Sequence, residues 1–363
     1  MKGLARYPAL TLAAVAVALA AVVAVWWSRP AVPVRVAVAD GAAILYYNSP
    51  AAVQVANRIH VGYVRTSGVV EVASVDIDAG AVVRRVEIHD YGKPDDHAAP
   101  ALWPDGEDIL VATAFHSSDL FLYRVGRDGG AALVCHWPGM FSYPRFDAVD
   151  GEIRLYVRND PDRAGNLALI RRPQDCTPEE VIYKTPQGTW LYATVPDGDR
   201  IAWSVWDREA GTHAGGFLDG EPVALAPSSY EETLMWSVAG DHMSATRFSD
   251  SFACCLVGEM VAELYRDGAL AFSTPPMPSP YYPTGIVLSK AAQEAIVPTV
   301  GHGIERRDLA TLAALPVCEQ PAAVNARAQY VANGGGSHLW LEFAPPIAGR
   351  DYASATVSLC LVP

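Results

Sequence analysis

The chain has 363 residues, of which 51% are hydrophobic and 18% are charged, and its formal net charge is −13. The hydrophobic content excludes an intrinsically disordered chain. The acidic balance argues against a nucleic-acid-binding protein, because such proteins present basic surfaces. A chain of this length can bury a large core.

The first segment predicts export and membrane attachment. Lys2 and Arg6 lie in a short n-region, residues 1–8, and an uncharged apolar stretch follows from Ala9 to Trp27. About 20 apolar residues are enough to span a bilayer, and the positive flank keeps the N-terminus in the cytoplasm. We therefore expect a transmembrane signal anchor at residues 9–27 and a main domain that is periplasmic or extracellular. A cleaved signal peptide, which would release a secreted protein, is the alternative.

Beyond a linker at residues 28–39, residues 40–363 predict one large all-β domain. Segments 58–65, 69–76 and 81–88 are rich in β-branched and aromatic residues, and turn sequences separate them. Similar segments recur at 108–115, 120–124, 153–158, 167–171, 200–206, 286–289, 338–343 and 353–362. Long helical periodicity is nearly absent outside the anchor.

Asp-Gly turns recur at a regular distance. Asp105, Asp150 and Asp197 each precede a glycine and a strand, and they lie 45 and 47 residues apart (105 to 150, 150 to 197). One four-stranded propeller blade occupies about 40–50 residues. The fold prediction is therefore a β-propeller of about seven four-stranded blades, with a pair of β-sandwiches as the alternative.

The cysteines predict disulfides. They lie at positions 135, 176, 254, 255, 318 and 360. In an oxidising compartment this number predicts one to three bridges. Cys254 and Cys255 are adjacent and would each need a distant partner, but the sequence does not determine the pairing.

Four places hold polar residues that the strand pattern does not require. They are the loop containing Asp96 and His97, the strand end at His116, Tyr143 in a Ser-Tyr-Pro-Arg segment, and Arg158 at the end of another strand. Blade loops of a propeller converge on one face, so these residues can meet there. Taken singly, each also fits a structural role as a turn, a strand end or a solvated surface residue.

Residues 41–206 resemble the BNR-4 repeat family, which includes ulvan lyases built on seven-bladed propellers. The matching stretches are YYNSPAAV (46–53), RIHVGYVRTSGVVEVASVD (58–76), DDHAAPA (95–101), AFHSSDLFLYRV (114–125), SYPRF (142–146), DGEIRLYVRND (150–160) and TWLYATVPDGDRIAW (189–203). The sequence departs from the family at Ala98 and Ala99, where relatives carry polar side chains. It departs again at Ala202, where relatives often carry histidine.

The resemblance implies a polysaccharide lyase that cleaves a uronate-containing glycan by β-elimination. Such a reaction needs a cation at the uronate carboxylate, a base for the C5 proton and an acid for the departing O4. Arg158 would meet the carboxylate. Tyr143 would be the base and could also be the acid, with His97 and His116 assisting or binding the carboxylate.

Three further residues are expected to bind substrate: Asp96, Arg145 and Tyr192. The expected partners are an anionic polysaccharide and, through the N-terminal helix, a membrane; no nucleic acid is expected. No metal-ligating cluster or cofactor motif is evident, although such propellers can hold a structural divalent cation.

Two other functions remain open from the sequence. The same propeller could bind a glycan or an envelope partner without turning it over. A sialidase-like hydrolase would need an arginine triad and a Tyr/Glu pair, and the sequence shows no convincing triad.

Overall fold

The structure is a computed structural model. It describes residues 32–43, 52–95, 97–161, 165–186, 188–207, 209–225, 230, 232–249, 258–279, 285–289, 291, 293–321, 325–332, 338–344 and 355–362. These residues form 28 strands and no α-helix, so the all-β prediction is confirmed. Among them, no helix is long and apolar enough to span a membrane. The predicted anchor, residues 9–27, lies outside the described residues.

Three sheets have four strands each. The first contains β1 (Val34–Ala42), β28 (Ala355–Leu361), β27 (Leu339–Ala344) and β26 (Asn325–Tyr330). The second contains β2 (Ala52–Val55), β3 (Arg58–Val64), β4 (Val69–Asp76) and β5 (Ala81–Asp90). The third contains β22 (Val287–Ser289), β23 (Glu294–Pro298), β24 (Ile304–Asp308) and β25 (Ala314–Leu315).

A seven-stranded sheet is built around one long strand. It contains β6 (Ala101–Asp105), β7 (Asp108–Ala114), β8 (Ser118–Val125), β9 (Ala131–Val149), β10 (Glu152–Asn159), β11 (Asn166–Arg171) and β12 (Glu180–Tyr183). The first part of β9 pairs with β8 and its second part pairs with β10. The sheet therefore divides into two four-stranded units that share β9. A short 3-10 helix, Pro173–Asp175, follows β11.

A nine-stranded sheet also divides into two units. One contains β13 (Thr189–Asp197), β14 (Arg200–Asp207), β15 (Thr212–Leu218) and β16 (Glu221–Pro222). The other contains β17 (Glu232–Ala239), β18 (His242–Phe248), β19 (Glu259–Arg266), β20 (Ala269–Ser273) and β21 (Met277–Pro278). They are joined by a single parallel pairing between β15 and β17.

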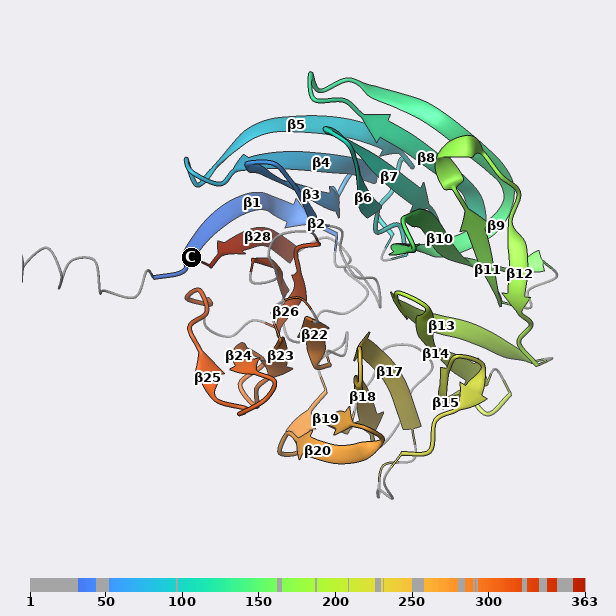
Figure 1. Ribbon diagram of the computed structural model, residues 1–363, viewed down its shortest axis with the longest axis vertical. Coiled ribbons are helices and arrows are strands. Elements are labelled where there is room, and N and C mark those ends of the chain that lie inside the picture. The colour runs from blue at the N-terminus through green and yellow to red at the C-terminus, as the bar shows by residue number, and fades with distance from the viewer. Residues whose placement is uncertain are drawn as a thin grey trace, which may run out of the picture.

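The units follow one another in chain order around a common centre (Figure 1). The first and last strands meet, because β1 pairs antiparallel with β28 from Val34–Leu361 to Ala42–Ala355. β1 begins inside residues 28–39, which the sequence analysis assigned to a linker. The core lies between neighbouring sheets: one apolar cluster combines residues of β1 to β5 with residues of β7 and β28.

The Asp-Gly turns lie between strands, as the sequence predicts. Gly106, Gly151 and Gly198, which follow the three evenly spaced aspartates, have φ values of 65°, 79° and 65°. Glycine adopts this left-handed region without a steric penalty. These turns join β6 to β7, β9 to β10 and β13 to β14, which are the first hairpins of three consecutive units.

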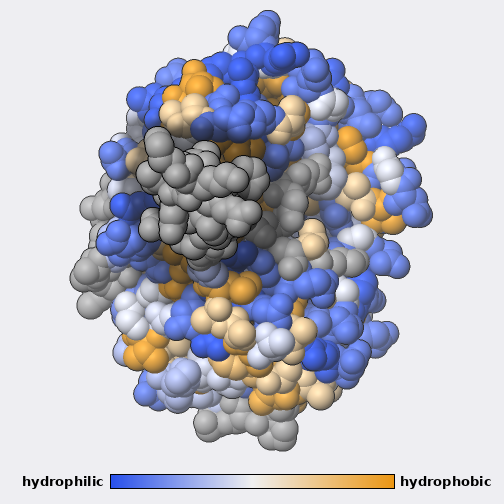
Figure 2. Space-filling view, turned by 60° about the vertical axis from the view of Figure 1, so that its left-hand side comes forward, coloured by the Kyte–Doolittle hydropathy of each residue, from blue (hydrophilic) through white to orange (hydrophobic). Residues whose placement is uncertain are grey.

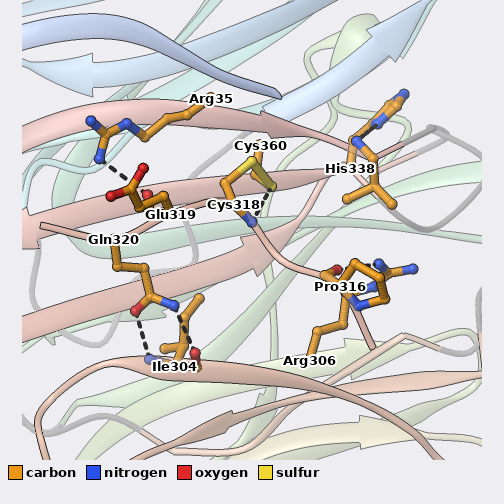
Figure 3. The surroundings of a disulfide bond; sticks show 10 residues. Arg35, Ile304, Arg306, Pro316, Cys318, Glu319, Gln320, His338 and Cys360 are labelled. Atoms are coloured by element: carbon orange, nitrogen blue, oxygen red, sulfur yellow. Dashed lines mark hydrogen bonds between the residues drawn. A yellow bond between two sulfur atoms is a disulfide. The ribbon is translucent and has the colours of Figure 1, made fainter. Parts of the chain in front are cut away.

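Two disulfides tie neighbouring parts of the chain together. Cys135 in β9 bonds to Cys176, and Cys318 bonds to Cys360 in β28. The second bridge fixes the last strand to the segment that precedes β26, where the backbone N–H of Cys318 also donates to Cys360 Sγ (Figure 3). Both bridges agree with the predicted range of one to three; Cys254 and Cys255 lie outside the described residues.

The described surface is mixed in character. Figure 2 shows hydrophilic residues over much of one side, with smaller apolar areas between them. The exposed large apolar side chains come from separate strands and ends, for example Val83 in β5, Leu133 in β9 and Leu270 in β20. Scattered apolar residues of this kind are ordinary on a folded protein.

Candidate active site

His97 is held by the aspartate two residues before it. Asp95 Oδ1 accepts hydrogen bonds from the backbone N–H of His97 at 2.8 Å and from His97 Nδ1 at 2.9 Å. The first of these bonds is the turn-capping role that the sequence left open. The second assigns the proton to Nδ1, so the neutral ring has its acceptor at Nε2. The loop, between β5 and β6, thus positions an Asp–His pair.

The charge of Asp95 is stabilised by the two histidines. Burial raises the pKa of Asp95, but the hydrogen bonds from His97 and the positive charges of His97 and His116 outweigh that effect. The net result is a pKa below the ordinary value for aspartate. Asp95 therefore carries its negative charge throughout the neutral range.

His116 stacks directly on His97. It lies in the turn after β7, and the two imidazole rings are almost parallel, with centroids 3.9 Å apart and an interplanar angle of 7°. His116 is exposed, whereas the side chain of His97 is only 13% exposed. Two stacked cationic rings would repel each other, so the pair favours sharing one positive charge.

Tyr143 lies behind His97, at an irregularity in β9. Ser142 pairs with Arg158 and Arg145 pairs with Tyr156, so two residues of β9 face one residue of β10. Such a β-bulge redirects side chains. Tyr143 has φ 57°, which is unfavourable for a bulky residue. Its ring centroid lies 5.2 Å from that of His97, and the residue is 2% exposed.

Arg158 completes the cluster from β10. Its Cζ lies 4.8 Å from the centroid of the Tyr143 ring, a cation–π contact. Its Nη2 forms an ion pair with Asp160 Oδ2 at 2.9 Å. The residue is 2% exposed. The cation is thus balanced by a carboxylate of the protein itself.

A hydrogen-bond network links Arg158 to the turn of His116. Asp160 Oδ2 also accepts a hydrogen bond from Ser117 Oγ at 2.8 Å. Ser142 Oγ accepts from the Ser117 backbone N–H at 2.8 Å and from Arg158 Nη2 at 3.3 Å. Sequence reasoning missed Asp160, Ser117 and Ser142. Their only signal was that each adjoins or nearly adjoins a residue that was predicted.

The three predicted substrate-binding residues have different outcomes. Asp96 lies outside the described residues, and Tyr192 lies in β13 but its side chain is not described. Arg145 is 9% exposed. Burial and the positive charge of Arg327, in β26, lower the pKa of Arg145 to about 9. The electrostatic surroundings of Arg145 therefore include a strand of another sheet.

Three residues of the cluster could in principle ligate a metal. Asp95, His97 and His116 each offer one ligand atom, and these atoms lie within 4.8 Å of one another. Ligand lone pairs must converge on the ion. In two nearly parallel rings the lone pairs run side by side, and one nitrogen of His97 is already bonded to Asp95. The observed arrangement suits proton transfer better than metal binding.

The comparisons with known proteins show a shared fold. No protein-family model matches the chain, and no curated protein matches it. The resemblance to the BNR-4 family is therefore not supported by a family model. Among solved structures, the chain is similar to an ulvan lyase of polysaccharide lyase family PL25, with a TM-score of 0.57 and 10% sequence identity. The match covers 91% of this chain and 96% of the lyase.

Proposed function

We propose that this protein is a seven-bladed β-propeller polysaccharide lyase that cleaves a uronate-containing glycan by β-elimination. The four-stranded units arranged around one centre, together with the fold shared with an ulvan lyase, support the propeller. The observation that carries the activity is the Asp95–His97 pair stacked on His116 beside Tyr143 and Arg158.

Proton removal from C5 is best assigned to His97. Its Nδ1 donates to Asp95, which leaves Nε2 as the proton acceptor and stabilises the imidazolium that forms. The sequence analysis gave this role to Tyr143. The 2% exposure of Tyr143 favours His97, because the histidine lies between the tyrosine and the exposed His116.

The carboxylate of the uronate is best assigned to His116 rather than to Arg158. His116 is exposed, so its neutral imidazole can donate a hydrogen bond to the carboxylate, and the one positive charge that the stacked pair accommodates then forms on His97 when it takes the C5 proton. Arg158 is already paired with Asp160 and covers the face of the Tyr143 ring, so its role is to hold that ring in place.

Protonation of the departing O4 is assigned to Tyr143. A phenol is a proton donor at neutral pH, and its ring contacts His97. Because Tyr143 is 2% exposed, this role requires the glycan to uncover the hydroxyl when it binds.

Ultraviolet absorbance of the 4,5-unsaturated uronate product tests the proposal on a panel of uronate polymers. We expect a rise with the wild-type protein and a loss of at least 100-fold in His97→Gln, the usual contribution of general base catalysis being about 10²–10⁴. His136→Gln is the matched control, because His136 is also bonded to an aspartate, Asp119, at 2.7 Å but lies outside the cluster. Equal rates in His97→Gln and the wild type would remove His97 from the mechanism.

Glycan binding without turnover is the second candidate function. The burial of Tyr143 and Arg158 favours it, because neither side chain is open to a sugar. Absence of a rise on every polymer, with binding that persists in Tyr143→Phe, would establish this alternative.

Export with membrane attachment is proposed for the whole chain. The two disulfides support an oxidising compartment. Protease treatment of cells whose outer envelope is permeabilised while the cytoplasmic membrane stays intact should cleave the main domain and leave the fragment containing residues 9–27 with the membrane. Complete protection of the main domain would contradict this placement.

A further inference from the structure

A polar pocket lies between the sheet of β2 to β5 and the sheet of β6 to β12. Its volume is about 270 Å³. Pockets for drug-sized ligands measure about 300–1,000 Å³, so this one suits a single sugar residue. It is lined by Val55, Ala56, Asn57, Arg58, His60, Asp76, Arg84, Glu107 and Arg127.

The pocket lies at the opposite end of the strands from the candidate active site. Consecutive connections of an antiparallel sheet alternate between its two ends. The β5–β6 loop with His97 and the β7–β8 turn with His116 lie at one end. The β6–β7 turn with Glu107 and the β8–β9 turn with Arg127 lie at the other. The two sites are therefore separate.

Three arginines give the pocket a local excess of positive charge on an acidic protein. Arg84 crosses between the sheets and donates to the backbone carbonyls of Gly126 and Arg127. Its Nε is buried and finds no acceptor within the described residues. Arg58 forms no ion pair with any described residue. An anion in the pocket would therefore meet the guanidinium groups of Arg58 and Arg84, whereas Arg127 is paired with Glu107.

The positive charges of Arg58 and Arg84 shift the pKa values of neighbouring groups in the pocket. Burial and the charge of Arg58 lower the pKa of Arg84 and outweigh the charge of Asp128, which raises it. Burial, followed by the charges of Arg84 and Arg58, lowers the pKa of His60 to about 4. His60 is thus neutral at physiological pH, and its Nδ1 shares a hydrogen bond with Ser74 Oγ at 3.1 Å. Binding an anion would relieve this repulsion.

The same pocket contains acceptors for hydroxyl groups. Asp76, Glu107 and the side-chain oxygen of Asn57 line it beside the arginines. Glu107 pairs with Arg127 at 3.1 Å, and Asp76 accepts the backbone N–H of Ala79 at 2.9 Å. These carboxylates would repel a simple oxyanion, whereas they accept hydrogen bonds from the hydroxyl groups of a sugar.

We propose that the pocket binds an acidic sugar residue, with the sugar's anionic group on Arg58 and Arg84 and its hydroxyls on Asp76 and Glu107. This binding does not depend on lyase activity, because the pocket shares no residue with the candidate active site. It would give the protein a second point of attachment to an acidic glycan.

The test is calorimetric titration of the full-length protein with methyl glucuronide. We expect binding by the wild type, at least tenfold weaker binding by Arg58→Gln, and no effect of Arg171→Gln, a half-exposed arginine paired with Glu152 elsewhere on the surface. His116→Ala should retain the pocket's binding. Arg58 is only part-buried and has no ion pair with the described residues, so its replacement should leave thermal unfolding unchanged.

The neutral methyl glucoside separates charge recognition from sugar recognition. It should bind at least tenfold more weakly than the glucuronide. The proposal is overturned if the glucuronide does not bind, if Arg58→Gln binds it as well as the wild type, if His116→Ala abolishes the binding, or if the glucoside binds equally well.

Discussion

Arginine, a carboxylate and tyrosine meet in several places of the described structure, and two buried clusters of this kind differ in how they use the tyrosine. One contains Arg247 of β18 with Glu263 and Tyr265 of β19; the other contains Arg158, Asp160 and Tyr143 at the candidate active site. In the first, Arg247 Nε donates to Glu263 Oε2 at 2.6 Å and Nη2 donates to the Tyr265 hydroxyl at 3.1 Å. Tyr265 also donates to Glu263 at 2.5 Å. The tyrosine hydroxyl is therefore hydrogen-bonded to both charged groups of the ion pair.

The second cluster uses the same residue types differently. Arg158 covers the face of the Tyr143 ring at 4.8 Å. Asp160 Oδ1 is buried and accepts no hydrogen bond from the described residues. Two residues in the cluster have positive φ, Ser117 at 51° and Tyr143 at 57°. Backbone strain and unsatisfied polar atoms are frequent at functional sites, where the stability of the surrounding fold offsets their cost.

A buried charged cluster with strained backbone and unsatisfied polar atoms is a better candidate for function than one whose polar groups are all bonded. The Arg247 cluster is closed, because the arginine, the carboxylate and the tyrosine hydroxyl are bonded to one another, and it fits a structural role between strands. It also contains a Tyr/Glu pair with one arginine, without the arginine triad that a sialidase-like site requires. The Arg158 cluster contacts His97 through the Tyr143 ring and the turn of His116 through Ser117, so it helps to hold both histidines in position.

Breaking the closed cluster should have the largest effect on stability. Glu263→Leu leaves Arg247 buried without its carboxylate, which typically costs about 3–5 kcal/mol. Chemical denaturation measures the loss, and lyase or glycan-binding activity per folded molecule should not change. The control is Glu180→Gln, an exposed partner of Arg171, which should change stability by less than about 1 kcal/mol. A loss of activity in folded Glu263→Leu would show that this cluster is also functional.

Breaking the open cluster should affect activity more than stability. Asp160→Asn keeps the shape and the Ser117 hydrogen bond but removes the charge that holds Arg158. Arg158 then holds the Tyr143 ring less firmly, and a misplacement that raises the barrier by about 1.4 kcal/mol lowers kcat on the uronate polymer about tenfold, with a smaller change in KM.

Asp147→Asn provides the matched control for Asp160→Asn. Asp147 is a part-buried aspartate that accepts the backbone N–H groups of Gly198, at 2.6 Å, and of Ala148, away from the histidines. It should alter stability without altering kcat. If both variants lower kcat equally, Asp160 acts through general stability and not through Arg158.

The strands were predictable because their signals are local. Segment 69–76 matches β4 at both ends, and the evenly spaced Asp-Gly turns proved to be the first hairpins of successive units. β1 was not predictable, because its partner β28 lies more than 300 residues away in sequence. The 19-residue β9 was missed as one strand, since it contains Pro138 and Pro144 and serves two units.

The candidate site was predictable only in part for the same reason. His97 in a loop and His116 at the end of a strand stood out in a recognisable order, and the structure brings them into contact. The role of Asp160 depends on the β9 bulge and on the turn after β7, which meet only in three dimensions. The pairing of Cys135 with Cys176 and of Cys318 with Cys360 likewise required the fold.

The smallest expected effect concerns the pH dependence of the site. Asp95 has a lowered pKa, so it stays negative as the pH falls through the range in which histidine protonates. Its charge favours protonated His97, the inactive form of a base. Asp95→Asn should therefore move the acid limb of the kcat/KM profile to lower pH, by about one unit, while lowering the maximal rate because the ring loses its orientation.

Asp95→Asn should also change how the stability of the fold depends on pH. A carboxyl whose pKa is lower in the folded state stabilises the fold above the pKa of the unfolded chain, and this contribution is lost as the pH falls through the folded pKa. Asp95→Asn should thus be least stable relative to wild type near neutral pH and approach it in acid. An acid limb that stays in place in Asp95→Asn would mean that His97 is not the group that titrates, and the base would have to be sought in His116 or Tyr143.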